Sequence, residues 1–121
     1  MQDKTTGVKV AEIAGPAGAP IIVLRFSGDI TSASKAVVLG TYEALPKESK
    51  RILLDFSKVE YLNSSGIALI IQMLMQAGKA GQSVQTFGLS PHFQKVFTMV
   101  GMTKYTNLYS DEPTACAAFA E

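Results

Sequence analysis

The sequence of 121 residues predicts a single α/β domain, residues 1–121, built from a small, mostly parallel mixed β-sheet with helices packed on it. Hydrophobic residues make up 47% of the chain and charged residues 17%, which is enough to form a core without disulfides or metals. The hydrophobic period also alternates repeatedly between strand-like and helix-like spacing. Successive strand–helix–strand units need right-handed crossovers and hence parallel strands, in the order β-β-α-β-α-β-α-β-α.

The first two strands are predicted to form a hairpin. Residues 8–13 alternate weakly, residues 15–20 read "GPAGAP" and form a turn, and residues 21–28 are an apolar run of strand length. Small and apolar residues then recur at helical spacing over residues 32–45, and Pro46 ends this segment.

A second helix is predicted after the short buried strand "RILLDF" of residues 51–56. Its apolar residues follow i, i+3, i+4, i+7 spacing, and Gly78 and Gly81 end it. The residues of this apolar face are Ile67, Ile70, Ile71 and Leu74.

The remaining elements follow the same alternation. A strand over residues 83–89 leads to Ser90 and Pro91, a capping serine and a proline suited to the first helical position. A strand over residues 104–109 and an Ala-rich helix over residues 111–120 complete the chain. The helix after Ser90 has an apolar face formed by Phe93, Val96, Phe97 and Val100.

Charge and hydropathy argue against nucleic acid and membrane as partners. The formal net charge is +1, and the longest basic cluster is "KESKR" at residues 47–51, which suits a solvated turn. No run of eighteen apolar residues and no apolar signal segment occurs. We therefore expect a soluble, cytoplasmic protein, in which the single cysteine, Cys116, is a packing residue.

The catalytic inventory favours a protein that is not an enzyme. His92 is the only histidine, and the carboxylates are scattered, so no metal site is expected. The glycine spacings of dinucleotide and phosphate loops do not occur, so no cofactor is expected either. Neither Ser64 nor Ser65 has the glycine two residues earlier that a serine hydrolase elbow requires.

The segment "NSSG", residues 63–66, is the most distinctive polar motif. Asn63, Ser64, Ser65 and Gly66 follow a buried strand and loop and stand at the start of an apolar helix. A helix N-terminus stabilises a phosphate through its unpaired N–H groups and its dipole. Helix capping explains only one of the two serines. Phosphorylation would explain the other.

Most of the chain resembles the STAS domain, specifically the anti-sigma factor antagonists. The matching pieces are "LRFSGDIT", "LLDFSKVEYLNSSGIALI" and "KAGQSVQTFGLSPHFQKVFTMVGM". Family members run strand, Asp-Ser-Ser/Thr-Gly, helix, strand, Ser-Pro and helix. The resemblance implies a bacterial regulator of transcription and signal transduction. Its unphosphorylated form would bind an anti-sigma factor with serine kinase activity and so free a sigma factor, with a phosphatase as a further partner.

The resemblance places the phosphoacceptor at Ser64, with Asn63, Ser65 and Gly66 completing the phosphorylation loop. Ser65 is then the structural serine, expected to satisfy backbone donors at the helix start. Two family acids are replaced, one by Asn63 and the other by Thr31. An amide still orients a neighbouring hydroxyl, but it carries no charge.

The expected partner-binding surface combines three segments. The helix after the phosphorylation loop presents one face away from its apolar residues. Because parallel strands gather their functional loops at one edge, the Ser90 turn and the segment after the second strand should join this face, with Ser90 beside Ser64. The residues are Ala68, Gln72, Met75 and Lys79, together with Asp29, Thr31, Ser90 and Pro91.

Two alternatives to a phosphorylation-gated antagonist stay open. The first is a STAS scaffold that binds a protein partner or small ligand without phosphorylation, which Asn63 favours. The second is a hydrolase that uses Ser64, which the missing base disfavours.

Overall fold

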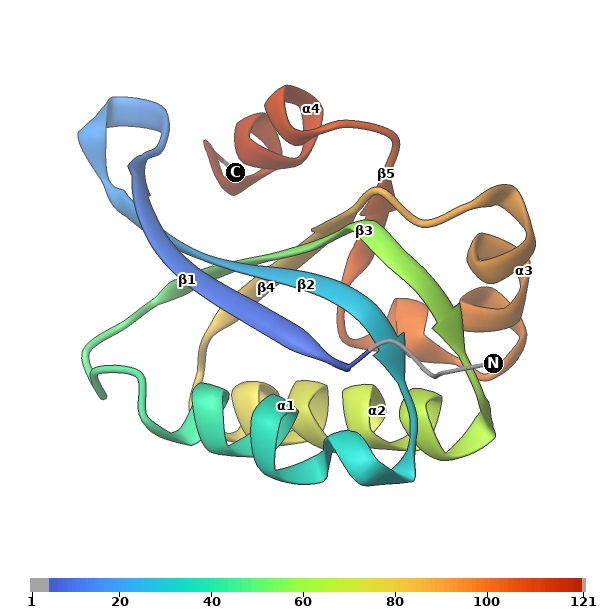
Figure 1. Ribbon diagram of the computed structural model, residues 1–121. Coiled ribbons are helices and arrows are strands. Elements are labelled where there is room, and N and C mark those ends of the chain that lie inside the picture. Colours follow the sequence, from blue (N-terminus) through green and yellow to red (C-terminus); the bar gives the residue numbers. More distant parts are fainter. Residues whose placement is uncertain (1–4, 121) are drawn as a thin grey trace.

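The computed structural model describes residues 5–120 and shows one mixed sheet of five strands in the order β1-β2-β3-β4-β5 (Figure 1). The predicted α/β class and the order of strands and α-helices are confirmed. The strands are β1 (Gly7–Ala14), β2 (Pro20–Ile30), β3 (Arg51–Leu62), β4 (Ser83–Phe87) and β5 (Asn107–Tyr109). The α-helices are α1 (Lys35–Glu43), α2 (Ser64–Lys79), α3 (Pro91–Met99) and α4 (Glu112–Ala117).

The predicted hairpin is formed by β1 and β2, which pair antiparallel from Gly7 opposite Ser27 to Ala14 opposite Pro20. The connecting 3-10 turn, Pro16–Gly18, places Ala17 at φ 58° and Gly18 at φ 77°. Glycine adopts this left-handed conformation without steric cost.

Strands β2, β3, β4 and β5 are mutually parallel, as the strand–helix–strand pattern requires. The β3–β4 register ends at Asp55 opposite Phe87, whereas β3 continues to Leu62 alongside β2. Residues 56–62 thus extend the sheet by about 20 Å, at roughly 3.3 Å per residue. The chain leaves this extension directly into α2.

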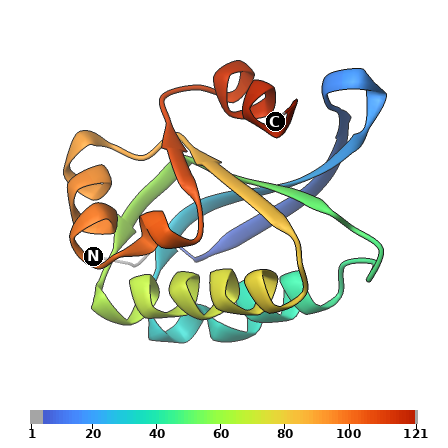
Figure 2. The same cartoon turned by 180° about the vertical axis from the view of Figure 1, so that it is seen from behind.

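One face of the sheet is covered by α1 and α2, which lie side by side (Figures 1 and 2). Helix α3 adds Phe97 to the same core, where its ring meets Phe56 edge-on at 5.8 Å. Phe56 in turn stacks on Phe26 of β2 at 5.1 Å. This aromatic row joins Phe56 of β3 to the neighbouring strand β2 and to helix α3.

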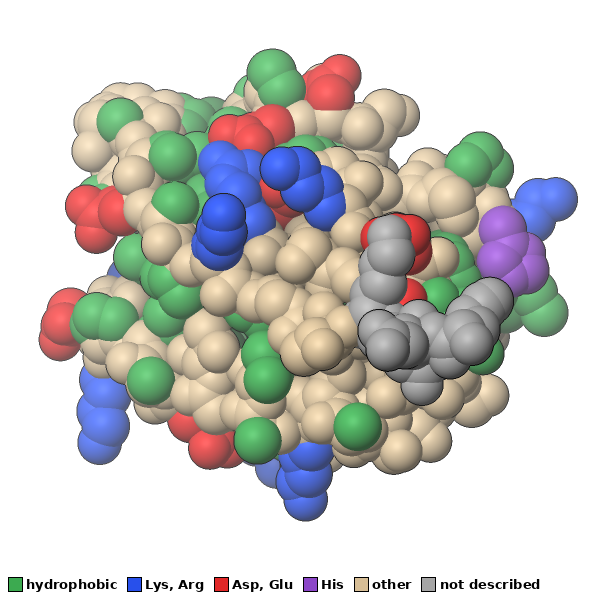
Figure 3. Space-filling model, in the orientation of Figure 1, with side chains coloured by type: hydrophobic (Ala, Val, Ile, Leu, Met, Phe, Trp, Pro, Cys, Tyr) green, Lys and Arg blue, Asp and Glu red, His purple; other side chains and the backbone are tan. Residues whose placement is uncertain are grey.

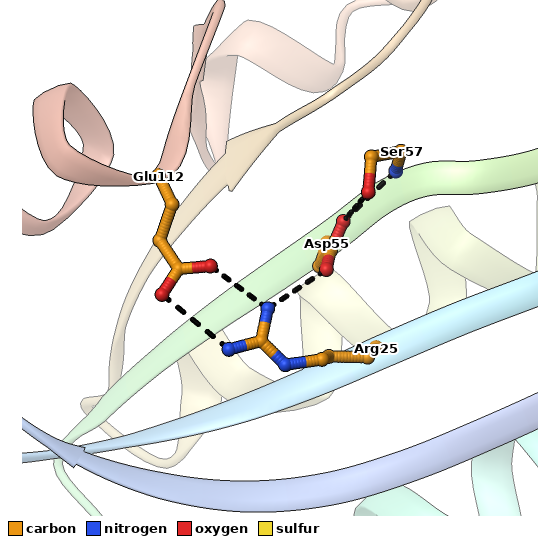
Figure 4. Close-up of polar contacts among 4 residues, drawn as sticks. All are labelled: Arg25, Asp55, Ser57 and Glu112. Carbon is orange, nitrogen blue, oxygen red and sulfur yellow. Dashed lines mark hydrogen bonds and ion pairs between the residues drawn. The ribbon is translucent and has the colours of Figure 1, made fainter.

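The other face is partly covered by α4, whose Ala115 and the following Phe119 pack on Ile21, Val23 and Leu53. Arg25 of β2 lies beside this contact and donates to Asp55 of β3 at 2.9 Å and to Glu112 of α4 at 2.8 Å (Figure 4). Hydrogen bonds to Glu112 and Asp55 raise the pKa of the Arg25 guanidinium. The cluster therefore ties the start of α4 to the middle of the sheet.

Several predicted boundaries differ from the structure. The strand expected over residues 51–56 runs to Leu62, and the strand expected to reach residue 89 ends at Phe87. The strand expected over residues 104–109 begins only at Asn107, because Met102–Lys104 forms a 3-10 turn, η3, after Gly101 at φ 84°. The helix expected from residue 32 begins with a 3-10 turn over Ser32–Ser34.

The predicted apolar face of α2 is rotated. Ile70 and Leu74 are buried as expected, but Ile67 and Ile71 are only half-buried. Helix α2 is buried along the side that also carries Leu69, Met73 and Ala77. Because α2 packs against both the sheet and α1, its buried side is wider than the four residues at i, i+3, i+4, i+7 spacing indicate.

The predicted apolar face of α3 is confirmed only in part. Phe97 is fully buried, whereas Phe93 and Val96 are half-buried and Val100 is 47% exposed. Within residues 5–120, none of the helices has both the length and the apolar character needed to span a bilayer.

Candidate functional site

The segment 63–66 joins the end of β3 to α2, and Asn63 caps that helix. Its backbone is extended, with φ −98° and ψ 179°, and helical geometry begins at Ser64. The side-chain oxygen of Asn63 accepts a hydrogen bond of 2.8 Å from the N–H of Gly66. Asparagine is among the strongest N-cap residues, so this position is satisfied without the family acid.

The expectation that Ser65 caps the helix is wrong. Capping needs an extended residue immediately before the first helical one, and that residue is Asn63. Ser64 and Ser65 occupy the first two helical positions, and both are exposed. The frequency of asparagine at N-caps is a sequence signal that would have identified Asn63 as the capping residue of α2.

Gly66 fixes how closely α2 approaches the end of β2. A Cβ atom on Gly66 would lie 2.0 Å from the carbonyl oxygen of Ile30, a separation that real contacts do not reach. The same oxygen accepts a hydrogen bond of 3.3 Å from the N–H of Asn63. The loop of residues 63–66 is therefore positioned against the Ile30 carbonyl, a contact that no sequence pattern predicts.

The first turn of α2 leaves donors available beside the two serine hydroxyls. Asn63 and Gly66 use their N–H groups as described, whereas within residues 5–120 no acceptor is paired with the N–H groups of Ser64 and Ser65. The first turn contains no acidic residue. An anion attached to Ser64 would thus meet unpaired donors and the positive end of the helix dipole.

The exposed face of α2 continues directly from Ser64. Ala68, Gln72, Met75 and Lys79 are all exposed, as the spacing predicted. Ser64 lies four residues before Ala68 and so shares this face. Met75 is 43% exposed, which places it outside the core proper. The result is one solvent-facing strip in which Lys79 is the only charged residue.

Asp29 and Thr31 border the loop from β2. Asp29 is the register partner of Tyr61 in the β3 extension, and Ile30 is the partner of Leu62. Thr31 caps the Ser32–Ser34 turn by accepting from the N–H of Ala33, while the Ser34 hydroxyl accepts from the N–H of Thr31. The Thr31 side chain is therefore engaged in holding the loop between β2 and α1.

Ser90 and Pro91 begin α3 as predicted, with the Ser90 hydroxyl accepting from the N–H of Phe93. Both Ser90 and Ser64 follow the carboxyl ends of parallel strands and lie at the same end of the sheet. However, β3 continues for residues 56–62 beyond its last pair with β4. The start of α3 is thus set back along the sheet from the loop of residues 63–66, and the later part of α3 lies nearer to α2 than its start does (Figures 1 and 2).

Comparison with known proteins assigns the chain to a family. A family model described as "Mlab, STAS domain" matches residues 18–109. The chain belongs to the STAS domain family. A curated relative, a putative anti-sigma factor antagonist named BtrV from Bordetella bronchiseptica, is 25% identical over 82% of this chain and 86% of its own length.

Two solved structures share the fold over nearly the whole chain. An anti-sigma factor antagonist from Mycobacterium paratuberculosis has a TM-score of 0.73 at 20% identity, covering 97% of this chain and 96% of its own. A putative anti-sigma factor antagonist from Thermotoga maritima has a TM-score of 0.75 at 12% identity, covering 93% and 95%. Both similarities establish the fold. Helix α4 lies beyond the region that the family model matches.

Proposed function

We propose that this STAS protein is a cytoplasmic, non-enzymatic anti-sigma factor antagonist that is switched by phosphorylation of Ser64. The unphosphorylated form binds an anti-sigma factor with serine kinase activity, and phosphorylation releases that partner. The similarity to the putative antagonist of Bordetella bronchiseptica supports the class of partner. The observation that carries the switch is the exposure of Ser64 at the first position of α2, on the same face as Ala68 and Gln72.

The local chemistry suits a hydroxyl that alternates between free and phosphorylated. A phosphoserine adds about −1.5 to −2 charges, and the first turn of α2 carries no acid to repel them. The helix dipole stabilises such a charge by about 0.3–1 kcal/mol. The same charge at a partner interface must be desolvated or repelled, so phosphorylation is tolerated by the domain and opposed in the complex.

The scaffold that binds without phosphorylation is the second candidate. Asn63 favours it, because its amide satisfies the helix cap without placing a carboxylate beside Ser64. A kinase that needs this acid to orient its substrate would not use the site. The hydrolase alternative gains nothing from the structure, since in the described part of the chain no side chain is hydrogen-bonded to Ser64.

Phosphorylation by a panel of purified anti-sigma factor kinases from the source bacterium tests the proposal. The wild-type protein and Ser64→Ala are incubated with ATP and each kinase, and intact mass is measured. We expect one kinase to add a single phosphoryl group to the wild type and none to Ser64→Ala. If no kinase phosphorylates the wild type but one binds it, the scaffold replaces the switch.

A further inference from the structure

A buried carboxylate in the middle of the sheet has no part in the proposed function. Asp55 is the only charged residue among the buried residues of the described chain, 5–120, and its side chain is 9% exposed. Its Oδ2 accepts a hydrogen bond of 2.9 Å from Nη1 of Arg25. Its Oδ1 accepts from the backbone N–H of Ser57 at 2.9 Å and from the Ser57 hydroxyl at 2.6 Å (Figure 4). One carboxylate oxygen therefore serves Arg25 and the other serves Ser57.

The same guanidinium joins Asp55 to helix α4. Nη1 of Arg25 also donates to Oε1 of Glu112 at 2.8 Å, and Nη2 donates to Oε2 at 3.4 Å. Glu112 is the first residue of α4, and its side chain is 33% exposed. On the surface below α4, Figure 3 shows basic side chains next to acidic ones, so solvent reaches this part of the molecule. We call Arg25, Asp55, Ser57 and Glu112 the Arg25 cluster.

Ser57 lies where the pairing of β3 changes. Strand β3 pairs with β4 only as far as Asp55. On the β2 side, Arg25 pairs with Asp55 and Ser27 pairs with Lys58, so two steps along β2 span three steps along β3. Such a bulge leaves a residue outside the ladder, and the Ser57 N–H finds its acceptor in the Asp55 side chain instead. From the bulge to its end, β3 is paired with β2 alone.

Release of α4 would change how Arg25 uses Asp55. Without Glu112, Nη2 of Arg25 loses its acceptor. A guanidinium and a carboxylate then favour a bidentate pair, which needs Oδ1 of Asp55 as well as Oδ2. The Arg25 side chain would thus compete with Ser57 for Oδ1. The bulge at Ser57, from which the β3 extension over residues 56–62 starts, would be held less firmly.

We propose that the docking of α4 is coupled to the loop of residues 63–66 through the Arg25 cluster. Release of α4 loosens the β3 extension and, with it, the loop that follows. Contiguous hydrogen-bonded groups carry such coupling between separate sites, and the coupling is reciprocal. Helix α4 is thereby a second place at which a binding partner controls the loop without contact to Ser64. This inference goes beyond the proposed function and does not depend on phosphorylation.

Amide hydrogen exchange of the full chain, measured by mass spectrometry, tests the coupling with two variants that act on α4. Glu112→Gln removes the charge of the outer carboxylate. Asp111→Ala removes the N-cap of α4, whose carboxylate accepts a backbone N–H at 2.9 Å, and leaves the Arg25 cluster chemically intact. We expect both to raise exchange rates roughly 3- to 10-fold in α4 and in residues 57–66. Glu48→Gln, an equal charge change in the exposed loop before β3, should alter neither segment.

Ser57→Ala runs the experiment in the reverse direction. It removes one of the two hydrogen bonds to Oδ1 of Asp55 and so makes the bidentate pair with Arg25 easier to form. We expect exchange in α4 to rise roughly 3-fold, which a purely local role of the Ser57 hydroxyl would not produce.

Three outcomes overturn the proposal. The first is faster exchange in α4 with unchanged exchange in residues 57–66, for Glu112→Gln or Asp111→Ala. The second is unchanged exchange in α4 for both of these variants, because neither group would then hold the helix. The third is wild-type exchange in α4 for Ser57→Ala. No kinase enters the experiment, so each of these outcomes leaves the proposed phosphorylation of Ser64 standing.

Discussion

Gly66 offers the sharpest test of how the loop of residues 63–66 is positioned. In Gly66→Ala the new Cβ atom would lie 2.0 Å from the Ile30 carbonyl oxygen, against a working minimum of 3.0 Å. The start of α2 or the end of β2 must therefore move by about 1 Å, because the obstructing atom is backbone and cannot rotate away. The bond from the N–H of Asn63 to the same oxygen is strained or lost.

The magnitude follows from three opposing terms. Overpacking costs about 1–3 kcal/mol. The lost backbone hydrogen bond costs about 1 kcal/mol. The better helix propensity of alanine returns about 1 kcal/mol. We expect Gly66→Ala to lower the free energy of unfolding by about 2 kcal/mol, measured by urea denaturation followed by circular dichroism.

Gly40 provides the matched control, because it lies inside α1 with no atom within 4 Å of the position of its Cβ. Gly40→Ala should raise the free energy of unfolding by about 0.5–1 kcal/mol through helix propensity alone. If Gly66→Ala is as stable as Gly40→Ala, the Ile30 carbonyl does not position the loop.

Three further predictions concern the loop and the α4 contact. Ser64→Ala and Ser65→Ala should each change the free energy of unfolding by less than about 0.5 kcal/mol, since neither hydroxyl caps the helix; a loss of 1 kcal/mol for Ser65→Ala would restore the capping role. Asn63→Ala should lower the free energy of unfolding, measured by urea denaturation, by about 1 kcal/mol, whereas Asn63→Asp should keep the helix cap. Asn63→Asp should also raise the rate of phosphorylation in a kinase assay. Equal stability of the two variants would contradict the capping role of Asn63. Arg25→Ala should lower the free energy of unfolding by about 2 kcal/mol, because it removes the cation beside the buried Asp55 and leaves Oδ2 without its donor, while Oδ1 keeps its hydrogen bonds from Ser57. It should also increase amide hydrogen exchange in α4; unchanged exchange there would show that the apolar contacts alone hold the helix.

The order of strands and helices could be predicted from the sequence because it depends on short-range patterns of turn residues and apolar spacing. Turn residues such as Gly81 and Pro46, and the period of the apolar residues, indicated each element in the right order. The boundaries were less accessible, since the length of β3 depends on pairing with β2 rather than on its own residues. Lys58 and Glu60 are polar; Lys58 pairs with Ser27 of β2, and Glu60 lies at a shift in the register between Val59 and Tyr61.

The site was predictable as a motif but not as a contact. The exposure of Ser64 and of the strip from Ala68 to Lys79 follows from helical spacing. The role of Gly66 depends on the Ile30 carbonyl, more than thirty residues earlier, and no spacing rule connects the two. The relative placement of Ser64 and Ser90 likewise depends on how many residues β3 continues beyond its last pair with β4.

The central claim is that phosphate on Ser64 controls partner binding, and one comparison tests it directly. The affinity of the wild-type protein for its kinase partner is measured before and after stoichiometric phosphorylation, with the modified residue identified by peptide mass spectrometry. We predict that the phosphate lies on Ser64 and that the phosphorylated form binds at least about tenfold more weakly, because a buried or opposed charge costs more than 1.4 kcal/mol. Equal affinities for the two forms, or a phosphate on Ser65 alone, would contradict the account.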